Sequence, residues 1–115
     1  KIAKRVYSQA LNEDGSMNNE CFCGKIDKTR VWWVQAEAIV GFYNCYQKTK
    51  DEKYKKAVED LWNYVKAYML DQREGAEWFW EVDRHGKPAG TKPVVEPWKC
   101  PYHNGRMCME MLRRM

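Results

Sequence analysis

The spacing of apolar residues along the 115-residue chain predicts helices of two kinds. Over residues 31–47 apolar side chains fall on nearly every side of a helix, a pattern typical of a helix buried all round. Over residues 52–70 the apolar positions form one stripe opposite charged residues, which predicts a helix with one side in water. Asp51 is placed to cap this second helix. The alternation indicates an inner and an outer layer of helices.

Shorter segments flank these two helices. Residues 2–11 have helical spacing and end in turn-forming residues, and residues 101–115 predict a last helix with a proline at its start. Residues 16–29 are polar and irregular, which indicates a loop with a short hairpin. Residues 77–83 alternate in part and predict a short strand or hairpin. Residues 87–97 are rich in Pro and Gly and predict an extended loop.

Length, charge and cysteine content limit the function. The chain is long enough for one domain. Its 20 basic and 16 acidic residues give a net charge of +4, and they are interspersed, which is typical of a solvated surface and not of a nucleic-acid site. No apolar run approaches the ~20 residues of a membrane span. Five cysteines without a C-x-x-C pair favour free thiols in the cytoplasm. We therefore expect no metal and no cofactor.

One polar and aromatic cluster lies at residues 98–106, with the sequence Trp-Lys-Cys-Pro-Tyr-His-Asn-Gly-Arg. Trp98 offers a flat apolar face for a sugar ring. His103 is suited to proton transfer near neutral pH, and Arg106 can bind an oxygen-rich ligand. The alternative interpretation is a core tryptophan, a capping histidine and a surface arginine.

A second cluster lies inside the apolar helix, where Trp33 and Glu37 are four residues apart and share one face. An ionised carboxylate in an apolar setting is costly unless it is paired. Glu37 therefore either forms a structural ion pair with an Arg or Lys of a neighbouring helix, or hydrogen-bonds to a sugar hydroxyl or a catalytic histidine.

These segments resemble a known family. Residues 31–38 and 98–106, with the Glu-Trp-Phe-Trp block inside 71–82, are similar to the C-terminal part of the N-acylglucosamine 2-epimerase superfamily, and within it to the cellobiose 2-epimerase branch. The resemblance covers essentially the whole chain. It implies an all-α fold, the C-terminal part of an (α/α)6 barrel with a short β-hairpin excursion. Residues 1–115 are then a single fragment that holds the last helices of the barrel's catalytic domain.

The resemblance also implies an enzymatic activity, the reversible epimerisation at C2 of a reducing-end sugar such as cellobiose. The sugar ring opens, one histidine removes the C2 proton to form an enediolate, and a second histidine returns a proton on the other face. By motif match His103 is one of these catalytic histidines. Trp33 and Trp98 would stack on the sugar, Glu37 would be a polar partner in the cleft, and Arg106 would have a structural role.

The chain departs from the family in length. The other catalytic histidine and its neighbouring glutamate belong to an earlier region of the family that this chain does not contain. We therefore expect the chain alone to be inactive and to self-associate through exposed apolar edges. Two alternatives stay open: a non-catalytic helical module that binds sugars or a protein, and an aldose–ketose isomerase on the same barrel, because the enediolate is shared.

Overall fold

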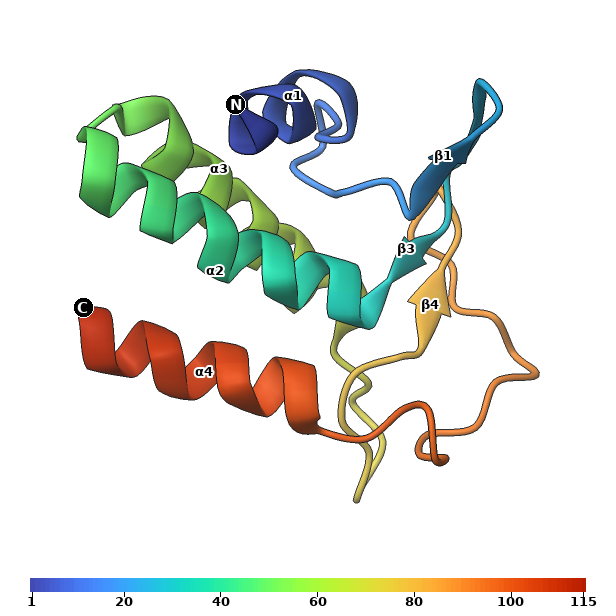
Figure 1. The fold of residues 1–115 in the computed structure, drawn as a ribbon. Coiled ribbons are helices and arrows are strands. Elements are labelled where there is room, and N and C mark those ends of the chain that lie inside the picture. The colour runs from blue at the N-terminus through green and yellow to red at the C-terminus, as the bar shows by residue number, and fades with distance from the viewer.

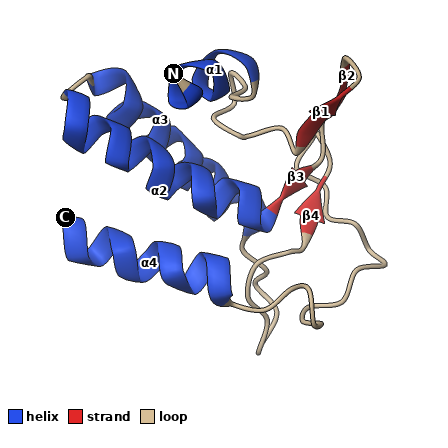
Figure 2. Cartoon of the chain, viewed as in Figure 1, coloured by secondary structure: helices blue, strands red, loops and turns tan.

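The computed structural model describes all residues from 1 to 115, and helices dominate it (Figures 1 and 2). The helices are α1 (Ile2–Gln9), α2 (Trp32–Thr49), α3 (Glu52–Tyr64), its π-helical continuation η1 (Val65–Met69), and α4 (Tyr102–Arg114). The strands are β1 (Glu20–Phe22), β2 (Lys25–Asp27), β3 (Arg30–Val31) and β4 (Glu81–Val82). The predicted helical fold with a small β excursion is confirmed. None of the helices combines the length and the apolar content that crossing a membrane requires.

Helices α2 and α4 lie side by side and run in the same direction, whereas α3 runs back along α2 in the opposite direction (Figure 1). In the chain the antiparallel α3 comes between the parallel α2 and α4. This is the order that alternating inner and outer layers of helices require. The N-terminal ends of α2 and α4 consequently lie at the same end of the molecule. The β3–β4 pair lies at that end too.

Helix α3 is the half-exposed helix that the sequence predicts. Asp51 caps it, since its side chain accepts a hydrogen bond from the Lys53 backbone N–H at 3.2 Å. One face, which includes Ala57 and Leu61, is buried against α2, and charged residues cover the other face. The helical path extends through η1 to Met69, close to the predicted end at residue 70.

Helix α2 departs from its predicted burial on all sides. A stripe through Trp33, Glu37, Gly41 and Asn44 is exposed or half-exposed. The buried residues of α2 lie on its other sides: Trp32, Gln35, Ala36, Ile39, Val40 and Phe42. The helices that pack against α2 are α1, α3 and α4, and of these α4 covers only part of the stripe, through His103 and Arg106 beside Trp33 and Glu37. The prediction was wrong here because an apolar pattern reports a tendency to be buried and does not supply the neighbour that buries it.

Gln35 is the fully buried polar residue of α2. Its side chain accepts a hydrogen bond from the Met17 backbone N–H at 2.8 Å and donates one to the Met17 carbonyl at 2.9 Å. Both halves of the amide are therefore satisfied. Gln35 fastens the loop before β1 to the core and is not a candidate for ligand binding.

The strands form two small antiparallel pairs. β1 and β2 form the hairpin predicted within residues 16–29. β4 lies in the predicted segment 77–83, but it pairs with β3 from far earlier in the chain. The Trp32 backbone N–H donates to the Trp80 carbonyl at 3.0 Å, which continues this pairing into α2. The connection before β4 is thereby held beside the N-terminal end of α2.

Candidate functional site

The first two turns of α2 and the first turn of α4 bring Trp33, Glu37 and His103 together. Glu37 Oε1 lies 2.8 Å from Nδ1 of His103. The other carboxylate oxygen, Oε2, accepts a hydrogen bond from the Arg106 guanidinium. The Trp33 ring is tilted against the His103 ring, with 5.9 Å between the ring centroids. Residues from two distant parts of the sequence therefore form one cluster at one end of the helices.

Helical spacing explains this arrangement. Trp33 and Glu37 are four residues apart on α2, and His103 and Arg106 are three residues apart on α4, so each pair shares a face of its helix. Because α2 and α4 run in parallel, the two faces meet in the same turn of each helix. Glu37 contacts both the arginine and the histidine, the two kinds of partner that the sequence left open.

The charge state of Glu37 follows from its neighbours. Partial burial favours the neutral carboxyl, but hydrogen bonds and charge from Arg106 and His103 outweigh it and hold the pKa of Glu37 below its ordinary value. Glu37 is thus ionised near neutral pH and can only accept hydrogen bonds. The Nδ1 atom of His103 must then carry the hydrogen. In the neutral imidazole this leaves Nε2 with a free lone pair.

Aromatic side chains surround the histidine. The rings of the buried Trp32 and of Tyr102 form T-shaped pairs with His103, with centroid distances of 6.4 and 5.1 Å. The His103 side chain is 35% exposed and Trp33 is 41% exposed. The histidine is therefore held on its inner side and open on the other, next to an accessible indole face. A neutral imidazole in this setting can exchange a proton with a ligand placed beside Trp33.

Trp98 is not joined to this cluster by any aromatic contact or hydrogen bond and is 83% exposed. It lies on the connection that leads into α4, one residue before Lys99, whose side chain is fully buried. Its predicted part in sugar binding stays a prediction. His85 also lies apart, in the turn after β4, where its Nε2 accepts a hydrogen bond from Arg84.

Sequence reasoning did not single out three polar residues next to the cluster. Lys99 is fully buried and pairs with Glu77, and Asn104 is nearly buried and hydrogen-bonds to the same carboxylate. A lysine is among the residues least often fully buried, so composition gave no reason to place it inside. Its pairing partner lies in another segment of the chain, which no local pattern reveals.

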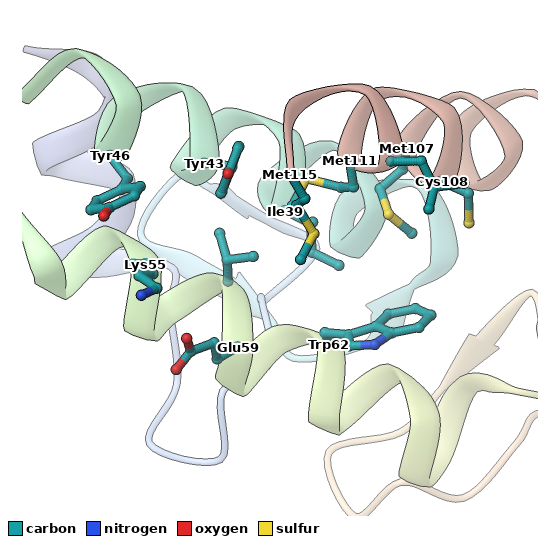
Figure 3. Close-up of a pocket in the computed structure, with 12 residues that line it drawn as sticks. Ile39, Tyr43, Tyr46, Lys55, Glu59, Trp62, Met107, Cys108, Met111 and Met115 are labelled. Carbon is teal, nitrogen blue, oxygen red and sulfur yellow. The ribbon is translucent and has the colours of Figure 1, made fainter. Parts of the chain in front are cut away.

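A groove of about 570 Å³ lies further along the helices, between α2, α3 and α4 (Figure 3). Its walls are mainly apolar and include Ile39, Trp62, Met107 and Met111. None of the clustered residues Trp33, Glu37 or His103 lines it. The groove lacks the convergent polar groups that orient a small polar ligand. Its chemistry suits packing against another apolar surface.

Comparison with known proteins identifies the family. The family model described as N-acylglucosamine 2-epimerase matches residues 3–104, so the chain belongs to this family. A cellobiose 2-epimerase of Ruminococcus albus is 54% identical over 114 residues, which are 99% of this chain and 29% of that protein. The structure of a cellobiose 2-epimerase from Bacillus thermoamylovorans B4167 superposes with a TM-score of 0.95 at 55% identity, covering 99% of this chain and 29% of the other.

A more distant relative is named D-mannose isomerase, from Marinomonas mediterranea. It is 31% identical over 96 residues, which are 77% of this chain and 22% of that protein. The matching solved structures of cellobiose 2-epimerases and of a D-mannose isomerase are (α/α)6 barrels, and the helices of this chain are part of such a barrel. The chain spans less than a third of the length of these relatives.

The charge of Glu37 predicts how stability depends on pH. Because the folded-state pKa lies below the ordinary value of 4.5, ionised Glu37 stabilises the fold above that pH, and the contribution disappears as the pH falls through the lowered pKa. Glu37→Gln is therefore expected to reduce the free energy of unfolding at neutral pH, and its difference from the parent should shrink in acid. Urea denaturation at a series of pH values measures this difference.

The matched control is Glu74→Gln, which alters an exposed glutamate outside this cluster. Its effect on the free energy of unfolding is expected to be within about 0.5 kcal/mol at every pH. A Glu37→Gln difference that stays constant from neutral to acid pH would contradict the assigned ion pairing.

Proposed function

We propose that this chain supplies one wall and one acid/base residue of the active site of a sugar 2-epimerase that acts at the reducing end of a disaccharide such as cellobiose. The observation that carries the proposal is the contact of His103 Nδ1 with Glu37, which leaves Nε2 free beside the exposed Trp33. Similarity over nearly the whole chain to proteins named cellobiose 2-epimerase supports the same substrate class.

In this proposal the opened sugar lies against Trp33 with its C2–H directed at His103 Nε2. The imidazole takes the C2 proton, the bonding electron pair forms the C1–C2 enediolate, and the resulting imidazolium is stabilised by the ionised Glu37. Arg106 holds the second oxygen of Glu37 and keeps the carboxylate in place. Return of a proton to the opposite face of C2 inverts its configuration.

The opposite face needs a second acid/base group. The family resemblance assigns it to a histidine outside this chain, and His85 faces Arg84 in a separate turn. We therefore infer that the complete enzyme is active and that the isolated 115 residues are not. The epimerase is favoured over an aldose–ketose isomerase because identity to the cellobiose 2-epimerases is 40–55%, against 28–31% to proteins named D-mannose isomerase.

The first test replaces the proposed acid/base residue in the complete enzyme. His103→Ala is expected to lower kcat for C2 epimerisation by roughly 10²–10⁴-fold with a much smaller change in KM, since general acid/base catalysis contributes about this factor. The measurement follows deuterium incorporation at C2 of cellobiose in heavy water, together with the epimer formed.

His85→Ala is the matched control, because it removes the other histidine of the chain from an exposed turn. It is expected to keep the parental rate of exchange. The catalytic assignment fails if the His103→Ala enzyme, folded as judged by its Tm, retains most of the exchange.

The second test separates sugar binding from packing at adjacent tryptophans. Trp33→Ala is expected to raise KM and lower kcat, because a misplaced sugar loses alignment with the base, while Tm changes little since the ring is 41% exposed. Trp98→Ala is expected to act in the same way. Kinetics and thermal unfolding are measured on the same preparations.

Trp32→Ala serves as the contrasting variant, because this ring is 4% exposed in the core. Its removal is expected to cost about 3–5 kcal/mol of stability. If Trp33→Ala or Trp98→Ala shows the same loss of stability with unchanged kinetics in the folded fraction, that tryptophan packs the core and does not bind sugar.

We also infer that the isolated chain self-associates. The apolar groove between α2, α3 and α4 is open, and the end of α4 adds exposed Leu112 and Met115 to it. An exposed contiguous apolar surface of this kind is a driving force for association, worth about 25 cal/mol per Å² that it buries.

Light scattering at micromolar concentration is expected to show a dimer or a larger species for the isolated chain. The double variant Leu112→Lys/Met115→Lys is expected to shift the chain toward the monomer, because it places charge inside the groove. Ile2→Lys changes an equally exposed apolar residue on α1 outside the groove and should leave the mass unchanged. A well-folded parental monomer would overturn this inference.

A further inference from the structure

The connection into α4 carries a buried lysine, Lys99, whose ion pair with Glu77 has no part in the proposed reaction. Lys99 is fully buried, and its Nζ donates to Glu77 Oε1 and, at 2.8 Å, to the Val94 carbonyl. The same ammonium group lies 5.8 Å from the centroid of the Trp32 ring. A buried charge persists only where such partners compensate its lost hydration. The surroundings of Lys99 Nζ therefore stabilise a positive charge at this position.

Glu77 has a second partner, and that partner belongs to α4. Its Oε2 accepts a hydrogen bond from Asn104 Nδ2 at 3.0 Å. One carboxylate thus binds the residue four positions before His103 and the residue immediately after it. Glu77 itself comes from the connection between η1 and β4, whose backbone pairs with the residues after η1.

Apart from the contacts of Glu37 with His103 and Arg106, the side chain that binds the first turn of α4 is Glu77. The helix has no side-chain cap, and the preceding residues 83–101 run as turns and bends, visible as the long tan connection of Figure 2. Successive side chains of a helix point about 100° apart around its axis. Holding Asn104 toward Glu77 therefore fixes the rotation of the first turn, and with it the direction of His103.

We propose that Glu77, Lys99 and Asn104 are positioning residues that set the rotation of the first turn of α4, so that Nδ1 of His103 donates to Glu37 and Nε2 is presented to substrate. Two carboxylates then hold the same turn from different directions. Glu37 binds His103 and Arg106, and Glu77 binds Asn104. The catalytic consequence rests on the proposed function of His103.

The most selective variant is Asn104→Ala. It releases the first turn of α4 from Glu77 Oε2 and leaves the Lys99–Glu77 ion pair intact, so the buried Lys99 ammonium keeps its counter-charge. The cost in stability is limited because Asn104 Oδ1 has no hydrogen-bond partner to lose. Asn63→Ala is the matched control, since it removes an exposed asparagine of α3.

The direct readout is the tautomer of the His103 ring. The chain has two histidines, so ¹⁵N-histidine labelling gives two ring systems, and His85→Gln assigns them. The parent is expected to show the neutral His103 ring as the Nδ1–H tautomer. Asn104→Ala should shift its nitrogen signals toward a mixture of tautomers, and Asn63→Ala should not. An unchanged His103 tautomer in folded Asn104→Ala would overturn the proposal.

The second readout is catalysis by the complete enzyme. Asn104→Ala is expected to lower kcat for C2 exchange by about 10–100-fold with KM within about twofold, as for a displaced catalytic group. If Asn104→Ala shifts the His103 tautomer but the parental enzyme shows no C2 exchange, the proposed function is rejected and the positioning role of Asn104 stands. A shifted tautomer with parental kcat would show that this rotation does not govern the reaction, and would overturn the catalytic half of the proposal.

A double variant decides the matter if Asn104→Ala does not fold. Lys99→Met/Glu77→Met replaces the buried lysine and its partly buried carboxylate partner with apolar side chains of similar volume, a change that folded proteins commonly accept. It removes the carboxylate that accepts the hydrogen bond from Asn104 and leaves Asn104 itself unchanged. The same tautomer shift is expected, and a parental His103 signal in this variant would contradict the proposal.

Discussion

The shared carboxylate of Glu37 is the interaction on which the candidate site depends. It joins α2 to α4 through both of its oxygens, one bound to His103 and the other to Arg106. Because Arg106 binds Oε2 of Glu37, it orients Oε1 toward His103 and keeps the carboxylate ionised. The hydrogen on His103 is then placed on Nδ1, and the chemistry available at Nε2 follows. The carboxylate of Glu37 thereby joins the two helices and places the hydrogen of His103.

Much of the helical framework could be predicted from local patterns. The stripe of apolar residues in α3 follows from spacing, and the cap at Asp51 follows from the residue type just before the helix. The polar, irregular composition of residues 16–29 indicated the loop that contains the β1–β2 hairpin. The pairing of β4 with β3 could not, because alternation marks a strand without naming its partner. The exposed stripe of α2 was hidden for a similar reason, since it depends on which helices are present to cover it.

The candidate site divides in the same way. A four-residue spacing in the sequence is enough to place Trp33 and Glu37 on one face of a helix. That this face meets His103 depends on the parallel packing of α2 and α4, which family resemblance could suggest and local periodicity could not. Neither family resemblance nor local periodicity predicted the Lys99–Glu77 pair, because a lysine flanked by a tryptophan and a cysteine carries no signal of burial.

Helix geometry separates two kinds of open surface on α2. The exposed polar stripe includes Glu37, Gly41 and Asn44, whereas the groove is lined from α2 by Ile39, Tyr43 and Tyr46. Each groove position follows a stripe position by two residues, which turns it about 200° around the helix axis and places it on the opposite side.

The two sides also differ in chemistry. The site at the start of the stripe joins an ion pair to an indole face, a combination suited to a hydrated polar ligand. The groove offers aliphatic, aromatic and thioether groups, a combination suited to another protein surface (Figure 3). An inner helix of a barrel must satisfy both demands, because one of its sides faces the ligand and the other faces the neighbouring helices. The incomplete cover of α2 is therefore two separate surfaces, each matched to a different kind of partner.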